Sequence, residues 1–287
     1  MRLHHYARLV VLSHSVFALP FALWGFALGW RVAKPPAWEI KLFWVVVAVI
    51  SARTAAMAFN RYADRHIDAQ NPRTAQREIP RGIVKPQEAL FLSIGSAAIF
   101  VAAAWALSPL CGWLAPVALL VLLGYSYTKR FTFLAHYVLG TALGLAPVGA
   151  YLAISERFSL EIWLIGAAVA LWVGGFDILY ALQDEHFDRE VGLYSIPAAF
   201  GEKAARVIAL ISHLMASSLL FYVGQRYEFY ARSLLYWAGW AGFVGFVLYQ
   251  HWVSRIISRI NRAFFTYNGI ASVLFGALAS IALFVAR

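Results

Sequence analysis

Charged residues and cysteine are both scarce in this chain of 287 residues. Asp, Glu, Lys and Arg make up 13% of the sequence, about half the share found in ordinary soluble domains, while 62% of the residues are hydrophobic. This balance excludes a typical soluble protein and indicates a chain embedded in a lipid bilayer. The single cysteine, Cys111, excludes an intrachain disulfide and any cysteine-based metal site.

Apolar stretches of about twenty residues recur along the whole chain, and each is long enough to cross a hydrocarbon core of ~30 Å as a helix. They predict nine membrane spans at about 9–31, 38–59, 88–108, 110–127, 134–154, 158–182, 204–223, 232–251 and 264–285. The first stretch is too long for a signal-peptide core and lacks a clear cleavage site after it. We therefore expect an all-α, polytopic membrane protein in which residues 1–287 form a single transmembrane domain.

The net charge of +10 could suggest a nucleic-acid partner, but the distribution of the charges fits a membrane protein better. Most of the 24 Lys and Arg residues fall in the N-terminus and in the loops after spans two, four, six and eight. Short loops that are rich in Lys and Arg stay in the cytoplasm. The pattern predicts a cytoplasmic N-terminus and no nucleic-acid partner.

Two acidic clusters share one internal spacing and end spans two and six. They are Asn60-x3-Asp64-x3-Asp68 and, 120 residues later, Tyr180-x3-Asp184-x3-Asp188. Charged side chains at membrane depth are costly, so they normally face a bundle interior or a watery cavity and mark ion or substrate chemistry. Both spans run inward in the predicted topology, so the two clusters can meet across one cavity at the cytoplasmic face.

The offset of 120 residues also predicts an internal duplication. Spans one to four and five to eight would form two four-helix pseudo-repeats, with a ninth helix left over. Binding sites in membrane proteins built from repeats commonly lie at the interface of the repeats. The loops at about 64–87 and 184–203 directly follow the clusters and mix charges with glycine and proline, which predicts short helices and turns that could cap the site.

The paired carboxylates predict a magnesium site. Two carboxylates one helical turn apart can hold Mg²⁺ with few protein oxygens and leave the other positions to water and phosphate. Two such pairs face to face could hold about two ions around a diphosphate. The predicted metal ligands are Asp64, Asp68, Asp184 and Asp188.

Cations around the clusters favour a phosphate substrate over a pathway for cations. Arg suits bidentate phosphate contacts, and Lys acts as a point charge. The residues expected to bind the diphosphate or the substrate are Asn60, Arg73, Arg77, Lys129, Arg130 and Tyr180. The alternative is that these cations serve only to orient the chain in the membrane.

Arg53 lies inside span two, about 10 Å from Asn60 by helical rise, and a buried Arg needs an anionic partner. It could form a structural salt bridge with Asp177, or it could receive the carboxylate of an acidic substrate. Asp177 in turn could act as a base, orient Arg53 or only pack.

These motifs resemble those of the UbiA superfamily of membrane-embedded prenyltransferases over nearly the whole chain. Residues 60–68 look like its first motif, Arg73-Thr74 and residues 77–82 look like the elements that follow, and residues 177–188 resemble its second motif. The run that ends at Arg130 is similar to the motif after span four. One departure is Arg61, where many relatives carry an acidic residue.

The resemblance implies a nine-helix fold and Mg²⁺-dependent transfer of an isoprenoid chain from polyprenyl diphosphate to an acceptor. It implies catalytic roles for Asp64, Asp68, Asp177, Asp184, Asp188 and Arg53. Arg53 and the start of the first motif are most similar to the quinone-biosynthesis branch, including 4-hydroxybenzoate polyprenyltransferases and the futalosine-route enzymes of menaquinone synthesis. We therefore expect an aromatic acid acceptor, 4-hydroxybenzoate or 1,4-dihydroxy-6-naphthoate, and a bacterial or archaeal plasma membrane with the active site facing the cytoplasm.

Two other functions stay open on the sequence alone. The chain could prenylate a non-carboxylated acceptor such as a haem, a chlorophyllide or a glycerol phosphate head. It could also be an ion-coupled transporter, although all four key aspartates lie at one face and no acidic ladder reaches the other side.

Overall fold

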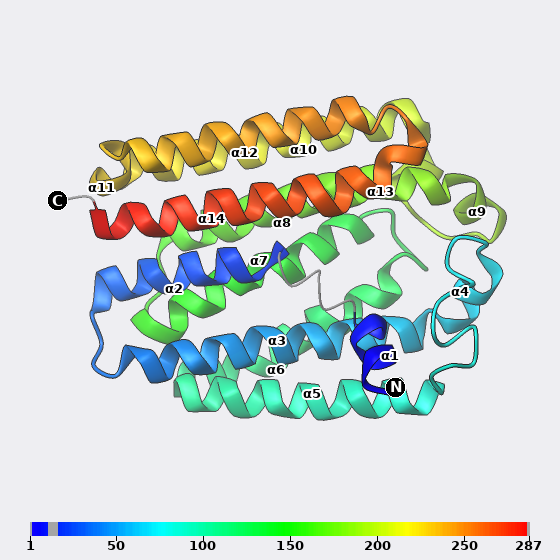
Figure 1. The fold of residues 1–287 in the computed structure, drawn as a ribbon, viewed down its shortest axis with the longest axis horizontal. Helices are drawn as coiled ribbons and strands as arrows, with labels where there is room; N and C mark the ends of the chain where they lie inside the picture. The colour runs from blue at the N-terminus through cyan, green and yellow to red at the C-terminus, as the bar shows by residue number, and fades with distance from the viewer. Residues whose placement is uncertain (1, 11–16, 286–287) are drawn as a thin grey trace.

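The computed structural model describes residues 2–10 and 17–285, and within these ranges it is helical with no strand (Figure 1). The long helices are α2 (Leu19–Ala33), α3 (Trp38–Ala63), α5 (Pro86–Leu107), α6 (Pro109–Thr128), α7 (Ala135–Ser155), α8 (Leu160–Ala181), α10 (Ile196–Arg226), α12 (Leu234–Val253) and α14 (Asn268–Val285). The shorter elements are α1 (Arg2–Leu9), α4 (Arg65–Gln70), the 3-10 helix Leu182–Asp184, α9 (Glu185–Glu190), α11 (Glu228–Ala231), the 3-10 helix Ile257–Arg259, α13 (Ile260–Arg262) and the π-helical turn Ala263–Tyr267. The all-α membrane fold predicted from the sequence is confirmed.

A helix lies at each of the nine predicted spans, and seven of the described helical segments are long and apolar enough to cross a membrane. Helix α2, with 15 residues, and α12 fall outside that set. Residues 11–16 of the first predicted span lie outside the described residues, and the long helix there begins at Leu19. The count of nine crossings therefore stays a prediction.

Serine side chains begin four of the long helices. The hydroxyl oxygens of Ser108, Ser159, Ser195 and Ser233 each accept a hydrogen bond from the backbone N–H three residues later. The first N–H groups of a helix have no partner inside it, and a serine at this position satisfies one of them. These caps fix where α6, α8, α10 and α12 start.

Helix α7 lies at the centre of the bundle and approaches its neighbours through glycines. A Cβ atom added to Gly140 would lie 2.1 Å from the carbonyl oxygen of Ala170 on α8, and one added to Gly144 would lie 2.4 Å from that of Gly166. Small residues allow helix backbones to pack closely where lipid offers no hydrophobic driving force. The close contact fixes α8, which carries part of the second motif, against α7.

The two acidic motifs share one local architecture. Helix α3 ends at Ala63 and the short helix α4 follows, while α8 ends at Ala181 and is followed by a 3-10 turn and α9. Helices α4 and α9 lie at the same end of the bundle, on the right in Figure 1. Helix α3 packs on α5 as α8 packs on α10, which agrees with the predicted duplication.

The expectation that the two aspartates of each motif lie one turn apart on a continuous helix is wrong. At Asp64 the backbone has φ −91° and ψ 4°, outside the α-helical region, so the chain bends and α4 leaves the axis of α3. The second motif bends in the same way at Asp184, where φ is −107° and ψ is 1°. The bend sets the second aspartate of each motif on a separate short helix.

Gly140→Ala should lower the melting temperature of the detergent-purified protein, because the backbone of α8 leaves no space for the added methyl group. We expect overpacking to cost about 1–3 kcal/mol, more than the roughly 1 kcal/mol that alanine gains over glycine as a helix former. A Cβ atom added to Gly149 on the same helix would have no atom within 4 Å, so Gly149→Ala should leave the melting temperature unchanged or raise it. Equal effects of the two substitutions would contradict this view of the α7–α8 contact.

Candidate active site

One cavity of about 760 Å³ receives all but one of the predicted site residues. Its polar end is lined by Asn60, Asp64, Asp68, Arg73, Arg77, Lys129, Tyr180, Asp184 and Asp188, and Arg53 and Asp177 also line it. Most of the remaining lining is apolar. It extends to Phe158, between α7 and α8, and to Trp163, in the first turn of α8, at the end of these helices away from the acidic motifs. A single cavity thus has the acidic residues at one end and a long apolar lining beyond them.

Asp64 is buried and held by two neighbours. Arg130 donates from Nη2 to Oδ1 over 2.9 Å, and Asn60 donates from Nδ2 to Oδ2 over 2.9 Å. Arg130 also donates to the carbonyl oxygen of Ala63 over 2.9 Å, one of the groups left without a helical partner where α3 ends. Arg130 does not line the cavity, so its observed contacts are structural: it holds Asp64 and the end of α3.

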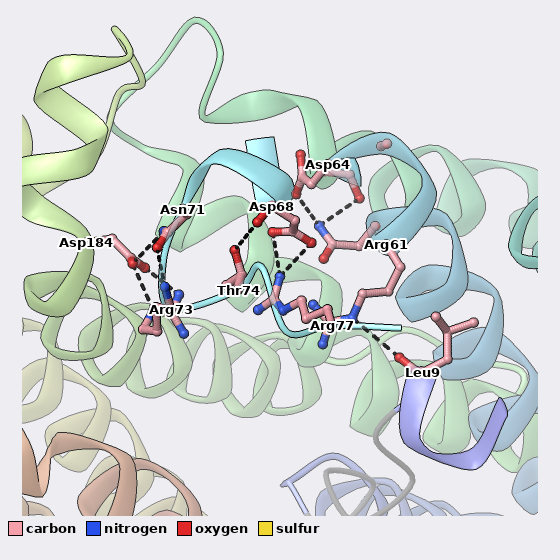
Figure 2. Close-up of polar contacts among 12 residues, drawn as sticks. Leu9, Arg61, Asp64, Asp68, Asn71, Arg73, Thr74, Arg77 and Asp184 are labelled. Atoms are coloured by element: carbon pink, nitrogen blue, oxygen red, sulfur yellow. Dashed lines mark hydrogen bonds and ion pairs between the residues drawn. The ribbon is translucent and has the colours of Figure 1, made fainter. Parts of the chain in front are cut away.

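Asp68 and Asp184 are each paired with an arginine of the first loop (Figure 2). Arg77 Nη1 lies 2.7 Å and 2.9 Å from the two carboxylate oxygens of Asp68. Arg73 donates from Nε to Asp184 Oδ1 over 2.8 Å and from Nη2 to Oδ2. Asn71 donates to the same Oδ1 over 2.9 Å. The loop that follows the first motif therefore binds the second motif, and the two motifs meet as predicted.

Asp188 and Lys129 differ from the other charged groups of this end. Asp188 is buried, and its Oδ1 atom has no hydrogen-bond partner among the described residues. The ammonium of Lys129 lines the cavity and makes no hydrogen bond within the described part of the chain, whereas its carbonyl accepts from Tyr194 N–H over 2.7 Å. A buried carboxylate oxygen and an ammonium at the cavity thus have no hydrogen-bond partner within the described residues.

Arg53 and Asp177 do not form the salt bridge that was one of two sequence-based alternatives. The buried Nε of Arg53 has no partner among the described residues. Asp177 Oδ2 instead lies 2.7 Å from Nδ1 of His136, at the start of α7. Arg53 and Asp177 line the same cavity, but Asp177 is hydrogen bonded to His136 and not to Arg53.

The sequence did not reveal the roles of His136, Asn71 and Arg61. His136 lies 41 positions from Asp177, so no local spacing links the two, and a buried histidine is most often structural. Asn71 stands in the Asn-Pro-Arg-Thr run, which could have drawn attention to it. Arg61, the departure from the family motif, donates to the carbonyl oxygen of Leu9 over 3.4 Å and so ties α3 to α1 (Figure 2).

Burial and neighbouring charges shift the pKa values of two groups at this end of the cavity. Burial raises the pKa of the Asp64 carboxyl above its usual value, and the nearby Lys129 and Arg130 only partly oppose it. Burial alone would lower the pKa of Arg73, but its hydrogen bonds to Asp184 and Tyr180 raise it above the ordinary value. Arg73 is therefore a permanent cation, and Asp64 ionises more readily when a further cation binds beside it.

The acidic residues fit a divalent metal only if a ligand completes its coordination. Among the described residues no three His, Cys, Asp or Glu side chains gather closely enough to hold an ion between them. Mg²⁺, however, is usually bound by one or two carboxylates together with water and substrate phosphates. The unpartnered Oδ1 of Asp188 and the two aspartate pairs on one cavity suit that arrangement.

A helical membrane protein that gathers four aspartates, a lysine and arginines at one end of a long apolar cavity has the layout of a membrane-embedded prenyltransferase. The chain belongs to the UbiA prenyltransferase family, whose sequence model matches residues 18–285. This confirms the family resemblance drawn from the motifs, and the protein is accordingly a prenyltransferase.

Its curated relatives include enzymes named 4-hydroxybenzoate octaprenyltransferase. That of Aeromonas hydrophila is 33% identical over 259 residues, which is 90% of this chain and 87% of the relative. That of Aliivibrio fischeri (strain MJ11) is 30% identical over 252 residues, 87% of this chain and 86% of the relative.

Solved structures of UbiA homologues share the fold. The apo structure of the homologue from Aeropyrum pernix K1 has a TM-score of 0.83 and 34% identity, covering 92% of this chain and 96% of that one. The homologue from Archaeoglobus fulgidus bound to DMAPP and Mg²⁺ has a TM-score of 0.74 at 21% identity, covering 98% and 99%.

Proposed function

We propose that this prenyltransferase moves a polyprenyl chain from polyprenyl diphosphate to an aromatic acid, with Mg²⁺ as its cofactor. The observation that carries the proposal is the layout of the cavity, with carboxylates and cations at one end, an apolar wall beyond them and an unpartnered arginine in between. The homologue of the same fold from Archaeoglobus fulgidus binds DMAPP or GPP together with Mg²⁺, and relatives at about 30% identity are named for 4-hydroxybenzoate, which supports both halves of the proposal.

The proposed metal ligands are the four motif aspartates, Asp64, Asp68, Asp184 and Asp188. When bound, Mg²⁺ neutralises diphosphate charge and so assists its departure. The arginines paired with three of these carboxylates hold them in place, so the ligands are oriented before substrate arrives. This preorganisation is the main way in which such a site lowers a barrier.

We assign some of the cations to binding the diphosphate and others to holding neighbouring side chains in place. Lys129, whose ammonium makes no hydrogen bond within the described residues, is the cation best placed to contact the diphosphate. Arg77 binds Asp68 through Nη1 alone and keeps other N–H groups for phosphate oxygens. Arg73 uses all three of its nitrogens on Asp184 and Tyr180, so its main role is to hold these two residues.

The reaction we propose begins when the bond between C1 of the prenyl chain and the diphosphate oxygen breaks. The apolar wall holds the rest of the chain and excludes water from the allylic cation that forms. The ring of Tyr180 lies at the polar end, with the Arg73 guanidinium 5.0 Å above it and Phe264 4.3 Å away, and its face could stabilise positive charge. A ring carbon of the acceptor then attacks C1.

Arg53 is the proposed anchor of the acceptor. An arginine atom buried without a partner is costly, and a carboxylate that binds it bidentately would remove that cost. This argument favours an aromatic acid over a non-carboxylated acceptor. Within that class we propose 4-hydroxybenzoate or 1,4-dihydroxy-6-naphthoate, and hence a step of ubiquinone or menaquinone synthesis.

We further propose that the site opens to the cytoplasmic face of a bacterial or archaeal plasma membrane. Most loops rich in Lys and Arg lie at the end of the bundle that carries α4 and α9. The loops at about 64–87 and 184–203 would then act as a cytoplasmic cap, and residues 1–287 would form one transmembrane domain.

Purified protein with radiolabelled geranylgeranyl diphosphate, Mg²⁺ and either aromatic acid should form a prenylated acid. The product should disappear with EDTA, and Asp64→Ala should lower the rate by at least about 100-fold, since it removes a charged ligand at the reacting centre. Arg232→Ala is the matched control, because Arg232 is exposed and pairs with Glu228 at the surface, at the end of the bundle opposite α4 and α9. A metal-independent product, or a product unaffected by Asp64→Ala, would contradict the proposed mechanism.

Arg53→Ala should raise the KM for the aromatic acid far more than the KM for the prenyl diphosphate, because it removes the proposed carboxylate anchor. A charged hydrogen bond of this kind contributes about 1.5–3 kcal/mol, which corresponds to roughly a 10- to 150-fold change. The measurement is initial rate against each substrate in turn. An unchanged KM for the acid would instead favour a non-carboxylated acceptor.

A further inference from the structure

Asp177 and His136 form a pair in the wall of the cavity, apart from the four motif aspartates. His136 is buried, with 5% of its side chain exposed, while 22% of the Asp177 side chain is exposed. Both residues line the cavity. The ring nitrogen Nδ1 lies 2.7 Å from Asp177 Oδ2, and no hydrogen bond or ion pair occupies Asp177 Oδ1 within the described residues. One carboxylate oxygen is therefore held, and the other is free to meet a ligand.

The tautomer of His136 follows from its second contact. The backbone N–H of Ile196 donates to Nε2 over 3.2 Å, so Nε2 is the acceptor and carries no proton. The proton of the neutral ring is then on Nδ1, which donates it to Asp177. Because a backbone N–H occupies Nε2, the ring cannot take up a second proton without breaking that bond. His136 can orient Asp177 but cannot relay its proton.

The position of Asp177 along α8 matches the depth that the acceptor ring would occupy. Asp177 precedes Asp184 by seven residues, and Arg53 precedes Asp64 by eleven, which places them about 10 Å and about 16 Å from the respective motif aspartate along the helix. If the acceptor carboxylate binds Arg53, its ring points toward the diphosphate end and passes the level of Asp177.

We propose that Asp177 is the base that removes the ring proton of the acceptor, and that His136 is a positioning residue for it. This inference rests on the proposed function, since it needs an aromatic acceptor with a ring C–H. It assigns one of the three roles that the sequence left open for Asp177.

The step follows the formation of the bond between C1 of the prenyl chain and the ring carbon. That carbon then carries both the prenyl group and a hydrogen, and the ring bears a positive charge. The C–H bond breaks, its electron pair returns to the ring, and the proton goes to Asp177 Oδ1. The diphosphate has already left with the electrons of the C1–O bond, so no further reactant is needed.

Other groups that line the cavity are less suited to this step. Tyr180 already accepts a hydrogen bond from Arg73 at its hydroxyl oxygen, and the carboxylates of Asp64, Asp68 and Asp184 are each paired with an arginine. Asp188 has no arginine partner within the described residues, but it is one of the proposed metal ligands at the polar end of the cavity. Among the described acidic residues of the cavity, Asp177 is the one that lies within α8, seven residues before Asp184, and its partner is the neutral ring of His136.

The test compares protiated with ring-deuterated 4-hydroxybenzoate. We expect the wild type to remove the proton faster than it forms the C–C bond, so the two acceptors should react at equal rates. Asp177→Asn should lower the rate of product formation by about 100-fold or more and should reveal a primary isotope effect, because proton removal now limits the rate. Cleavage of the C1–O bond should persist, and the allylic cation that is not trapped by the acceptor should react slowly with water to give the prenyl alcohol, which is measured together with the diphosphate released. Asp177→Glu should recover part of the rate without an isotope effect.

His136 has its own variants and a matched control. His136→Ala should lower kcat with little change in the KM for either substrate and should reveal a smaller isotope effect. His136→Asn, which can still donate to Asp177, should restore much of kcat. His213→Asn alters a histidine that is equally buried and hydrogen bonded, to His251 and Trp172, but does not line the cavity, so it should show no isotope effect.

Two results would overturn the inference. One is an Asp177→Asn enzyme that forms product at the wild-type rate, and the other is a slow variant without an isotope effect, which would make Asp177 a structural or binding residue. If the wild type forms no prenylated aromatic acid at all, the proposed function itself fails, and that outcome is distinct from either of the others.

Discussion

The neutralisation of buried aspartates by arginines from neighbouring segments is the interaction on which this site depends. Burying a carboxylate costs several kcal/mol unless a partner with good geometry offsets it. Asp64 is paired with Arg130 and Asp68 with Arg77, while Arg73 reaches Asp184 across 111 positions of sequence. That last pair joins the loop of the first motif to the second motif. The arginine contacts that offset the cost of burying these carboxylates thus also hold the two motifs together around one cavity.

Three groups that line the cavity have no such pairing in the described part of the chain. Asp188 has an oxygen without a partner, the ammonium of Lys129 makes no hydrogen bond, and the Nε of Arg53 is buried alone within the described residues. Unpaired buried polar atoms are rare in native proteins and usually have a functional explanation. Their order along the cavity, with Asp188 and Lys129 at the polar end and Arg53 deeper, is the order in which the proposed prenyl diphosphate and acidic acceptor would need them.

Composition and spacing predicted the long helices and the meeting of the two acidic motifs, and long-range contacts explain what they missed. The apolar stretches located every long helix, and the repeated aspartates correctly implied that two distant segments meet. The bend at Asp64 was missed because a four-residue spacing suits a continuous helix as well as a broken one. The pairing of Asp177 with His136, and of Arg130 with the end of α3, depends on how α6, α7 and α8 pack against their neighbours, which no local pattern records.

The two aspartate pairs are proposed to hold divalent ions around a diphosphate, and the other roles in the site follow from that arrangement. Anomalous diffraction from crystals grown with Mn²⁺ and a non-hydrolysable prenyl thiodiphosphate tests it most directly. We expect metal peaks beside the carboxylates of Asp64 and Asp68 and of Asp184 and Asp188, with the thiodiphosphate between them and Lys129 in contact with it. A diphosphate bound elsewhere in the cavity, or metal peaks away from these four carboxylates, would contradict it.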